Sequence, residues 1–232
     1  MSGAITFSLN ATAEDGALYK LFILGRHGQG YRTECRSRGS HWAKLNGDDE
    51  ITWGPDPELT PLGKDQARDV NAMWTQEIQA GMPLPDFLYS SPFTRALDTL
   101  RITFGDFLGQ TPRPLVLENC REVSGVHTCD KRRTRSYIVA AFPEVDIEEG
   151  FTEEDEYYRD DLREPPESVV ARARAVLLKI FEEREREFIS ITAHGGWINA
   201  FLNAVGRERF ALSTGGVLPL IVKCARAYIV CI

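Results

Sequence analysis

The chain has 232 residues, of which 43% are hydrophobic and 26% charged, and its formal net charge at pH 7 is −7. Such a composition is ordinary for a globular protein that buries a core without disulfides or structural metals. The acidic balance argues against nucleic acid or an anionic membrane as a main partner, although a pocket can still attract a small anion.

Cysteine usage and the N-terminal stretch indicate the compartment. The five cysteines are dispersed and contain no C-x-x-C pair, so neither a zinc site nor a redox pair is indicated, and a reducing compartment is expected. The first twenty residues do not resemble a secretory signal. No apolar run approaches the ~20 residues needed to span a bilayer. We therefore expect a cytoplasmic protein.

Strands and helices alternate in the first half of the chain, after an N-terminal arm expected over 1–17. An unbroken apolar run predicts a buried strand over 19–25. Thr60-Pro61 predicts the start of a helix that ends before Gly81. Three further elements follow in order: a strand in "DFLYSSP" at 86–92, a helix over about 93–108, and a short strand in "PLVLEN" at 114–119.

The second half repeats the alternation. A helix is predicted after Pro165-Pro166, a strand in "FISITAHGG", a helix from Trp197 to about Val205, and terminal strands near 217–222 and 226–232. We expect one domain over 18–232, with substrate-side insertions at about 31–58 and 120–166, the second partly helical. Alternating strands and helices predict an α/β fold with a mostly parallel central sheet covered on both faces, a three-layer sandwich.

Polar residues follow four of the predicted strands. Parallel strands bring their carboxyl ends to one edge of the sheet, where open α/β sheets bind ligands. That edge would collect Arg26 with His27, Arg95, Glu122 and His194.

This set suits phosphoryl transfer. Guanidinium groups match phosphate oxygens and keep their charge, and a neutral imidazole can attack phosphorus. A second histidine can stabilise developing charge, and a carboxyl can protonate the leaving oxygen. The set offers no row of carboxylates for Mg²⁺, so we expect a reaction without metal or other cofactor, through a phosphohistidine. Gly28 and Gly30 would let backbone N–H groups approach the phosphate.

Four motifs, each placed at the end of a predicted strand, carry a family resemblance. "RHG", "SSPFTRALDT", "REVSGVHTCDKR" and "TAHGG" resemble the histidine phosphatase superfamily, in its phosphoglycerate mutase-like branch, and the "CREVSGVHTCDKRRTRS" run resembles fungal members. The resemblance covers about residues 19–205. It implies a phosphoglycerate mutase-like fold, with His27 as the phosphorylated residue, Glu122 as the proton donor, and a phosphate pocket completed by Arg26, Arg95 and His194.

Further residues are candidates for binding. Gly28 and Thr33 are expected to contact phosphate, and the candidates for substrate contact are Gln29, Gly30, Tyr31, Arg36 and Arg132. Thr33 stands where many relatives carry asparagine, and Gly25 stands where they carry a larger or hydroxyl residue. Arg132 lies in a basic run that could equally be a solvated helix face.

The favoured function is a phosphatase acting on a small phosphorylated metabolite. A phosphoglycerate-type mutase shares the same chemistry and differs only in where the phosphoryl group goes. A phospho-ligand binding module without turnover is a third reading, which the complete set of five site residues disfavours.

Overall fold

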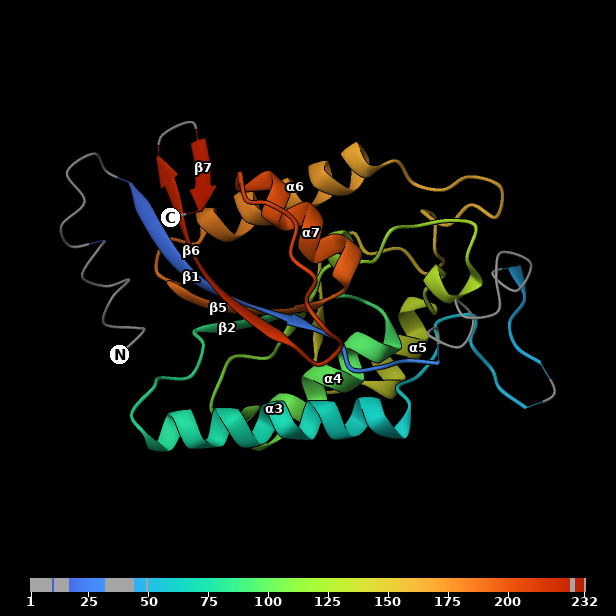
Figure 1. The fold of residues 1–232 in the computed structure, drawn as a ribbon, viewed down its shortest axis with the longest axis horizontal. Coiled ribbons are helices and arrows are strands. Elements are labelled where there is room, and N and C mark those ends of the chain that lie inside the picture. The colour runs from blue at the N-terminus through green and yellow to red at the C-terminus, as the bar shows by residue number, and fades with distance from the viewer. Residues whose placement is uncertain (1–9, 11–16, 32–43, 49, 226–227, 232) are drawn as a thin grey trace.

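A buried strand at the centre of the sheet explains the three layers. The computed structural model describes residues 10, 17–31, 44–48, 50–225 and 228–231. β1 (Leu18–Arg26) contributes side chains to both faces of the sheet. Phe22 and Leu24 pack against the pair of helices on one face, and Leu21 packs against the pair of helices on the other face. These layers lie on opposite sides of the sheet (Figure 1) and consist of α6 (Pro166–Glu182) with α7 (Gly195–Ala204), and α3 (Pro61–Gln79) with α4 (Thr94–Phe104).

The sheet is mostly parallel, as the sequence predicts. Its strand order is β4-β3-β2-β5-β1-β6-β7. The strands from β4 to β1 run parallel, whereas β6 runs antiparallel to β1, and β7 antiparallel to β6. The remaining strands are β2 (Phe87–Ser90), β3 (Leu115–Val116), β4 (Asp146–Ile147), β5 (Phe188–Ala193), β6 (Val217–Ala225) and β7 (Tyr228–Cys231). β4 was not predicted, because two residues are too few to show a period.

Most helix boundaries follow from local chemistry. The hydroxyl of Thr60 accepts the N–H of Gly63 at 3.1 Å, and Pro61 opens α3, so the predicted cap is confirmed. α4 is shorter than predicted, because a 3₁₀ turn over Gly105–Phe107 replaces its last turn. Within the second insertion, α5 (Arg135–Ala141) provides the predicted helical part.

The described parts of the first insertion are held by isolated bridges. Gly30 bridges Leu59, and Gly47 bridges Thr52. The first of these bridges fixes the turn after β1 against the residues that precede α3. Among the described residues, no helix is both long and apolar enough to cross a membrane.

Candidate active site

Two histidines meet at the carboxyl edge of the sheet. β1 pairs with β5 in parallel, with Arg26 beside Ala193, so His27 and His194 follow neighbouring strand ends. Their ring centroids lie 4.9 Å apart with the planes at 60°, and both side chains are buried. The parallel register therefore brings together two residues that are far apart in the sequence.

Hydrogen bonding determines which nitrogen of His27 carries a proton. Nδ1 of His27 lies 2.6 Å from the carbonyl oxygen of Gly28. Because a carbonyl only accepts, Nδ1 must be the donor. Neutral His27 then has its lone pair on Nε2, which makes Nε2 the nucleophilic nitrogen. On the other ring, Nε2 of His194 lies 2.6 Å from the hydroxyl of Ser91, and Phe93 packs edge-on at 5.2 Å.

The two arginines occupy different depths. Arg26 lines the cavity described below and donates to the carbonyl of Leu212 at 2.6 Å. Arg95 is fully buried and packs over the ring of Phe93 at 4.5 Å. Its guanidinium lies 3.8 Å from Asp56 and 3.3 Å from Asp130. Arg95 is thus positioned by two buried carboxylates and is not among the described residues that line the cavity.

Asp56 also links the first insertion to α4. Its carboxylate accepts from the backbone N–H of Thr94 at 3.0 Å and from the hydroxyl of Thr94 at 2.7 Å. Burial raises the pKa of Asp56 to about 6, although the charge of Arg95 and the hydrogen bonds from Thr94 act in the opposite direction. Asp56 therefore holds the start of the helix that carries Arg95.

Glu122 lies against the first turn of α7. Its Oε1 accepts from the N–H of Val123 at 3.0 Å and its Oε2 from the N–H of Gly196 at 3.4 Å. A Cβ on Gly196 would lie 2.1 Å from Oε1 of Glu122, so a side chain at this position would displace the carboxylate. The side chain of Glu122 is buried but still lines the cavity. Glu122 and His27 thus line the same cavity.

The backbone around Glu122 is held by a buried ion pair. Arg172 of α6 forms two hydrogen bonds with Glu164, at 2.7 and 2.8 Å. The same guanidinium donates to the carbonyls of Asn119 at 2.9 Å and Glu122 at 3.4 Å, and Glu164 accepts the N–H of Ser124 at 3.0 Å. The Arg172–Glu164 pair thus clamps the segment 119–124 on both sides of Glu122.

A cavity of about 410 Å³ opens at this edge. Five of the predicted site residues line it: Arg26, His27, Gln29, Gly30 and Glu122. The volume suits a small ligand. The remaining lining residues are Val123, Arg163, Gly195, Gly196, Asn199, Arg209, Phe210, Ala211, Leu212 and Thr214.

Gly28, which is predicted to contact phosphate, is not among the described residues that line the cavity. Its N–H donates to the hydroxyl of Thr99 at 3.0 Å and is therefore already used. A Cβ at this position would lie 2.2 Å from the carbonyl oxygen of Gly63, so glycine is needed for the turn to pack against α3. Gly25, by contrast, has room for a Cβ, which would make only ordinary contacts.

Arg132, which is predicted to contact substrate, is not among the described residues that line the cavity either. This side chain is 3% exposed, and its Nε donates to Glu118 at 2.6 Å. Its two Nη groups donate to the carbonyls of Thr152, Arg133, Glu153 and Glu154. The guanidinium therefore holds the second insertion together, because backbone acceptors surround it.

The other candidates have mixed outcomes. Tyr31 donates its N–H to the carbonyl of Glu58 at 3.2 Å and is not among the described residues that line the cavity. Thr33 and Arg36 lie outside the described residues. Gln29 lines the cavity while its Oε1 accepts from the hydroxyl of Thr60 at 2.9 Å.

Several cavity residues were missed by the sequence analysis. Arg163 and Arg209 lie in irregular segments without a hydrophobic period, and Asn199 lies in a helix whose polar residues carry no motif. Ser91 is part of the quoted "SSPFTRALDT" run, but its contact with His194 depends on the neighbouring register of β2 and β5. Only the fold brings these residues to the site.

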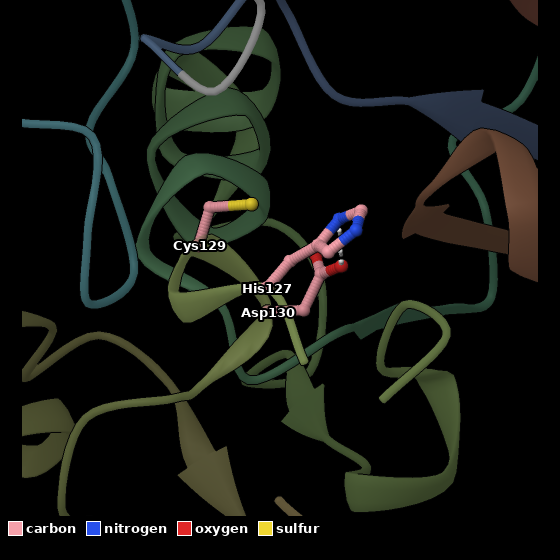
Figure 2. A group of neighbouring side chains, drawn as sticks. All are labelled: His127, Cys129 and Asp130. Atoms are coloured by element: carbon pink, nitrogen blue, oxygen red, sulfur yellow. Dashed lines mark ion pairs between the residues drawn. The ribbon is translucent and has the colours of Figure 1, made fainter. Parts of the chain in front are cut away.

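One group of side chains has the composition of a metal site. Ligand atoms of His127, Cys129 and Asp130 lie within 4.8 Å of one another. Figure 2 marks the ion pair between Nδ1 of His127 and an oxygen of Asp130, which lie 4.0 Å apart. Asp130, however, already pairs with Arg95 and accepts from Arg163 at 2.9 Å. Two guanidinium charges on this carboxylate disfavour a metal cation, so we interpret Asp130 as the centre of an ion-pair network.

Comparison with known sequences identifies the family. A family model of the histidine phosphatase superfamily (branch 1) matches residues 22–212. The chain belongs to the histidine phosphatase superfamily. The resemblance based on its four motifs is thereby confirmed.

Three fungal relatives are named as phosphoglycerate mutase or phosphomutase-like proteins. A protein named probable phosphoglycerate mutase from Arthroderma benhamiae is 37% identical, over 93% of this chain and 67% of its own length. The probable phosphoglycerate mutase PMU1 of Saccharomyces cerevisiae is 34% identical over 88% of this chain and 79% of its own length. The phosphomutase-like protein 3 of Candida albicans is also 34% identical, and the chain spans 65% of its length.

Solved structures share the fold. The phosphoserine phosphatase of Entamoeba histolytica, in complex with 3-phosphoglyceric acid, superposes with a TM-score of 0.52 at 22% identity, over 91% of this chain and 94% of that one. A mycobacterial glucosyl-3-phosphoglycerate phosphatase superposes with a TM-score of 0.51 at 17% identity, over 88% and 89% of the two chains. At these identities the likeness concerns the fold, which is that of phosphoglycerate mutase-like phosphatases.

Proposed function

We propose that the chain is a phosphatase that hydrolyses a small phosphorylated metabolite through a phosphohistidine at His27. The observation that carries this proposal is the hydrogen bond between Nδ1 of His27 and the carbonyl of Gly28 at 2.6 Å. This hydrogen bond leaves Nε2 of the neutral His27 ring unprotonated. His194 and the carboxyl of Glu122 lie at the same edge of the sheet, and Glu122 lines the cavity. A nucleophile, a charge stabiliser and a proton donor are then present together.

The first step transfers the phosphoryl group. Nε2 of His27 attacks phosphorus, and the bond between phosphorus and the ester oxygen breaks. Glu122 gives its proton to that oxygen, so the substrate leaves as an alcohol. Arg26 and His194 stabilise the charge on the phosphoryl oxygens during the transfer. Arg95, held by Asp56 and Asp130, adds its positive charge to this stabilisation.

The second step regenerates the enzyme. Water attacks the phosphohistidine, and the carboxylate of Glu122 takes up the proton that the water loses. The bond between phosphorus and Nε2 breaks, inorganic phosphate leaves, and His27 returns to its neutral form. The proposal requires no metal, because guanidinium groups neutralise the phosphate charge.

The names of the relatives favour a second candidate. Two of them are named as probable phosphoglycerate mutases. A mutase would use the same phosphohistidine and return the phosphoryl group to a hydroxyl of the bound product instead of to water.

Product analysis separates the two functions. The chain is incubated with a panel of phosphorylated metabolites, and free phosphate and isomerised ester are measured in the same samples. Phosphate release without isomer supports the phosphatase. Isomer formation that exceeds phosphate release would replace the phosphatase with the mutase. A His27→Ala control must abolish whichever product is formed.

A further inference from the structure

A second cavity adjoins the one that His27 and Glu122 line. It has a volume of about 260 Å³ and lies between the first turns of α6 and the neighbouring helix α7, which belong to the same layer of the fold (Figure 1). Four residues line both cavities, namely Val123, Gly196, Asn199 and Arg209. The second cavity, which we call the side groove, therefore opens directly beside the first.

The walls of the side groove are mainly apolar. They are formed by Val123, by Pro166, Val169 and Val170 of α6, and by Ala200 of α7. Val169 and Ala200 are buried, whereas Val123 and Val170 remain partly exposed. An apolar group that covers these two valines removes hydrocarbon surface from water, which is favourable. The side groove therefore suits a neutral apolar ligand.

The carboxylate at the side groove offers no free charge to a cation. Among the described residues, Glu164 is the one carboxylate that lines this groove. Arg172 donates two hydrogen bonds to it, at 2.7 and 2.8 Å, and the hydroxyl of Ser168 and the N–H of Ser124 donate two more, at 2.8 and 3.0 Å. Four donors use the acceptor capacity of a carboxylate. Arg209, which lines both cavities, is exposed and keeps its charge in water.

The position of Glu122 relates the side groove to the leaving group. In the proposed mechanism, Glu122 protonates the ester oxygen that leaves with the alcohol. Val123 follows Glu122 directly, and Gly196 donates its N–H to Glu122 at 3.4 Å, and both of these neighbours line the two cavities. A carbon chain attached to the leaving oxygen therefore starts next to the side groove.

We propose that the side groove binds the alcohol part of the substrate, so that the preferred substrates are phosphate monoesters of alcohols with an apolar chain. The inference rests on the proposed function, because the role of Glu122 places the leaving oxygen. Burial of each methylene group adds a similar gain in free energy. The length of the chain should therefore determine kcat/KM for as long as the added methylenes lie in the groove.

Three esters with matched leaving groups test the side groove. Ethyl, butyl and hexyl phosphate release alkoxides of nearly the same basicity, so a difference in kcat/KM reports binding of the chain. We expect kcat/KM, measured by phosphate release, to be about tenfold or more higher for hexyl than for ethyl phosphate, since one fully buried methylene corresponds to about fourfold. Equal kcat/KM for the three esters would overturn the proposal.

Variants then assign the preference to the groove. Val170→Asp places a carboxylate in the wall and should reduce the ratio of hexyl to ethyl kcat/KM at least about fivefold, because the chain would have to desolvate a charge. The ratio compares two esters on one variant, so partial unfolding cancels. Val170→Thr keeps the shape of the side chain and should lower the ratio less, which gives a test even if Val170→Asp does not fold.

Leu178→Asp is the matched control. Leu178 lies on the same helix, is 52% exposed and does not line the side groove. Its replacement should leave the ratio of hexyl to ethyl kcat/KM unchanged. An equal ratio in the Val170 and Leu178 variants would contradict the assignment.

Binding to a variant without the nucleophile separates this proposal from the proposed function. Dissociation constants of the three esters are measured by calorimetry on His27→Ala, alone and combined with Val170→Asp. Binding that tightens with chain length, with an increasingly negative heat-capacity change that Val170→Asp removes, supports the side groove even if the wild type hydrolyses none of the esters. Hydrolysis of ethyl phosphate by the wild type, with binding independent of chain length, would leave the phosphatase standing and overturn the side groove.

Discussion

The hydroxyl of Ser91 lies 2.6 Å from Nε2 of His194, and both residues are fully buried. β2 and β5 are neighbours in parallel register, with Ser90 beside Thr192, so the residues just beyond their ends come within hydrogen-bonding distance. The bond fixes the imidazole plane of His194 beside His27. Ser91, which is not among the predicted catalytic residues, thereby orients His194, which is one of them.

Replacement of Ser91 should impair catalysis without unfolding the protein. In Ser91→Ala the ring of His194 loses this partner, and we expect kcat/KM to fall about tenfold, the equivalent of one hydrogen bond of about 1.4 kcal/mol. Ser90→Ala is the control, because Ser90 is equally buried but its hydroxyl, within the part of the chain that the structure describes, donates only to the carbonyl of Ser91. Steady-state kinetics with thermal unfolding checks both variants, and equal losses of activity would contradict the role of Ser91.

The role of Glu122 depends on the leaving group. A basic alkoxide needs a proton to leave, whereas a nitrophenolate hardly does. Glu122→Gln should therefore slow phosphorylation by an alkyl phosphate by roughly 10² to 10⁴ and by a nitrophenyl ester much less. Single-turnover kinetics isolates this step from the hydrolysis of the phosphohistidine. Glu167→Gln, an exposed residue at the start of α6, provides the control. Equal losses for both esters would exclude Glu122 as the acid.

The ion pair between Arg172 and Glu164 holds the backbone around Glu122. Replacement of Arg172 should therefore also make the phosphorylation rate depend on the leaving group, but less strongly than replacement of Glu122. Arg172→Lys keeps a positive charge but cannot form the two parallel bonds to Glu164 while also reaching the carbonyls of Asn119 and Glu122. We expect the rate with an alkyl phosphate to fall about tenfold, with a smaller loss for a nitrophenyl ester, and the free energy of unfolding to fall by about 2 kcal/mol.

Arg174→Lys on the exposed side of the same helix is the matched control. Urea unfolding together with single-turnover rates measures both quantities. A loss of stability with no dependence on the leaving group would show that Arg172 supports the fold without positioning Glu122.

The pKa of Asp56 predicts a pH dependence of stability. Burial raises it from 3.8 to about 6, so the folded state holds the proton more tightly than the unfolded chain. The stability linked to this proton is fully present below about pH 4 and is lost as pH rises through about 6. The free energy of unfolding of the wild type, relative to Asp56→Asn, should therefore fall by roughly 3 kcal/mol between pH 4 and 7.

Urea unfolding at several pH values measures this difference. Asp56→Asn removes the titration and keeps an oxygen that can accept from Thr94. A difference that rises with pH would contradict the prediction, because it would mean that the pairing with Arg95 outweighs the burial of the charge.

The sequence predicts the parts of the site that follow directly from strands. His27, His194 and Glu122 each follow a run or motif that can be read locally, and parallel pairing then fixes their common edge. The same reasoning predicts the cap at Thr60 and the three layers. It fails for β4, whose two residues carry no period.

The sequence does not predict contacts that depend on how loops fold back. Arg132 and Arg163 belong to the same charged insertion, yet one is buried against backbone carbonyls and the other lines the cavity. Their neighbours in sequence are equally polar, so only the tertiary course of the chain distinguishes them. Gly28 likewise reads as part of a phosphate-binding turn, whereas its lack of a side chain is required by the close approach of Gly63.

Trapping of the phosphoenzyme tests the central proposal most directly. The chain is mixed with a ³²P-labelled substrate in the presence of EDTA and quenched within one turnover, and the labelled residue is located by proteolysis and mass spectrometry. We expect an acid-labile, alkali-stable phosphoryl group on His27, and no labelled protein in His27→Ala, whose fold is checked by circular dichroism. Phosphate release without a labelled intermediate, a label on another residue, or a requirement for added metal would contradict the account.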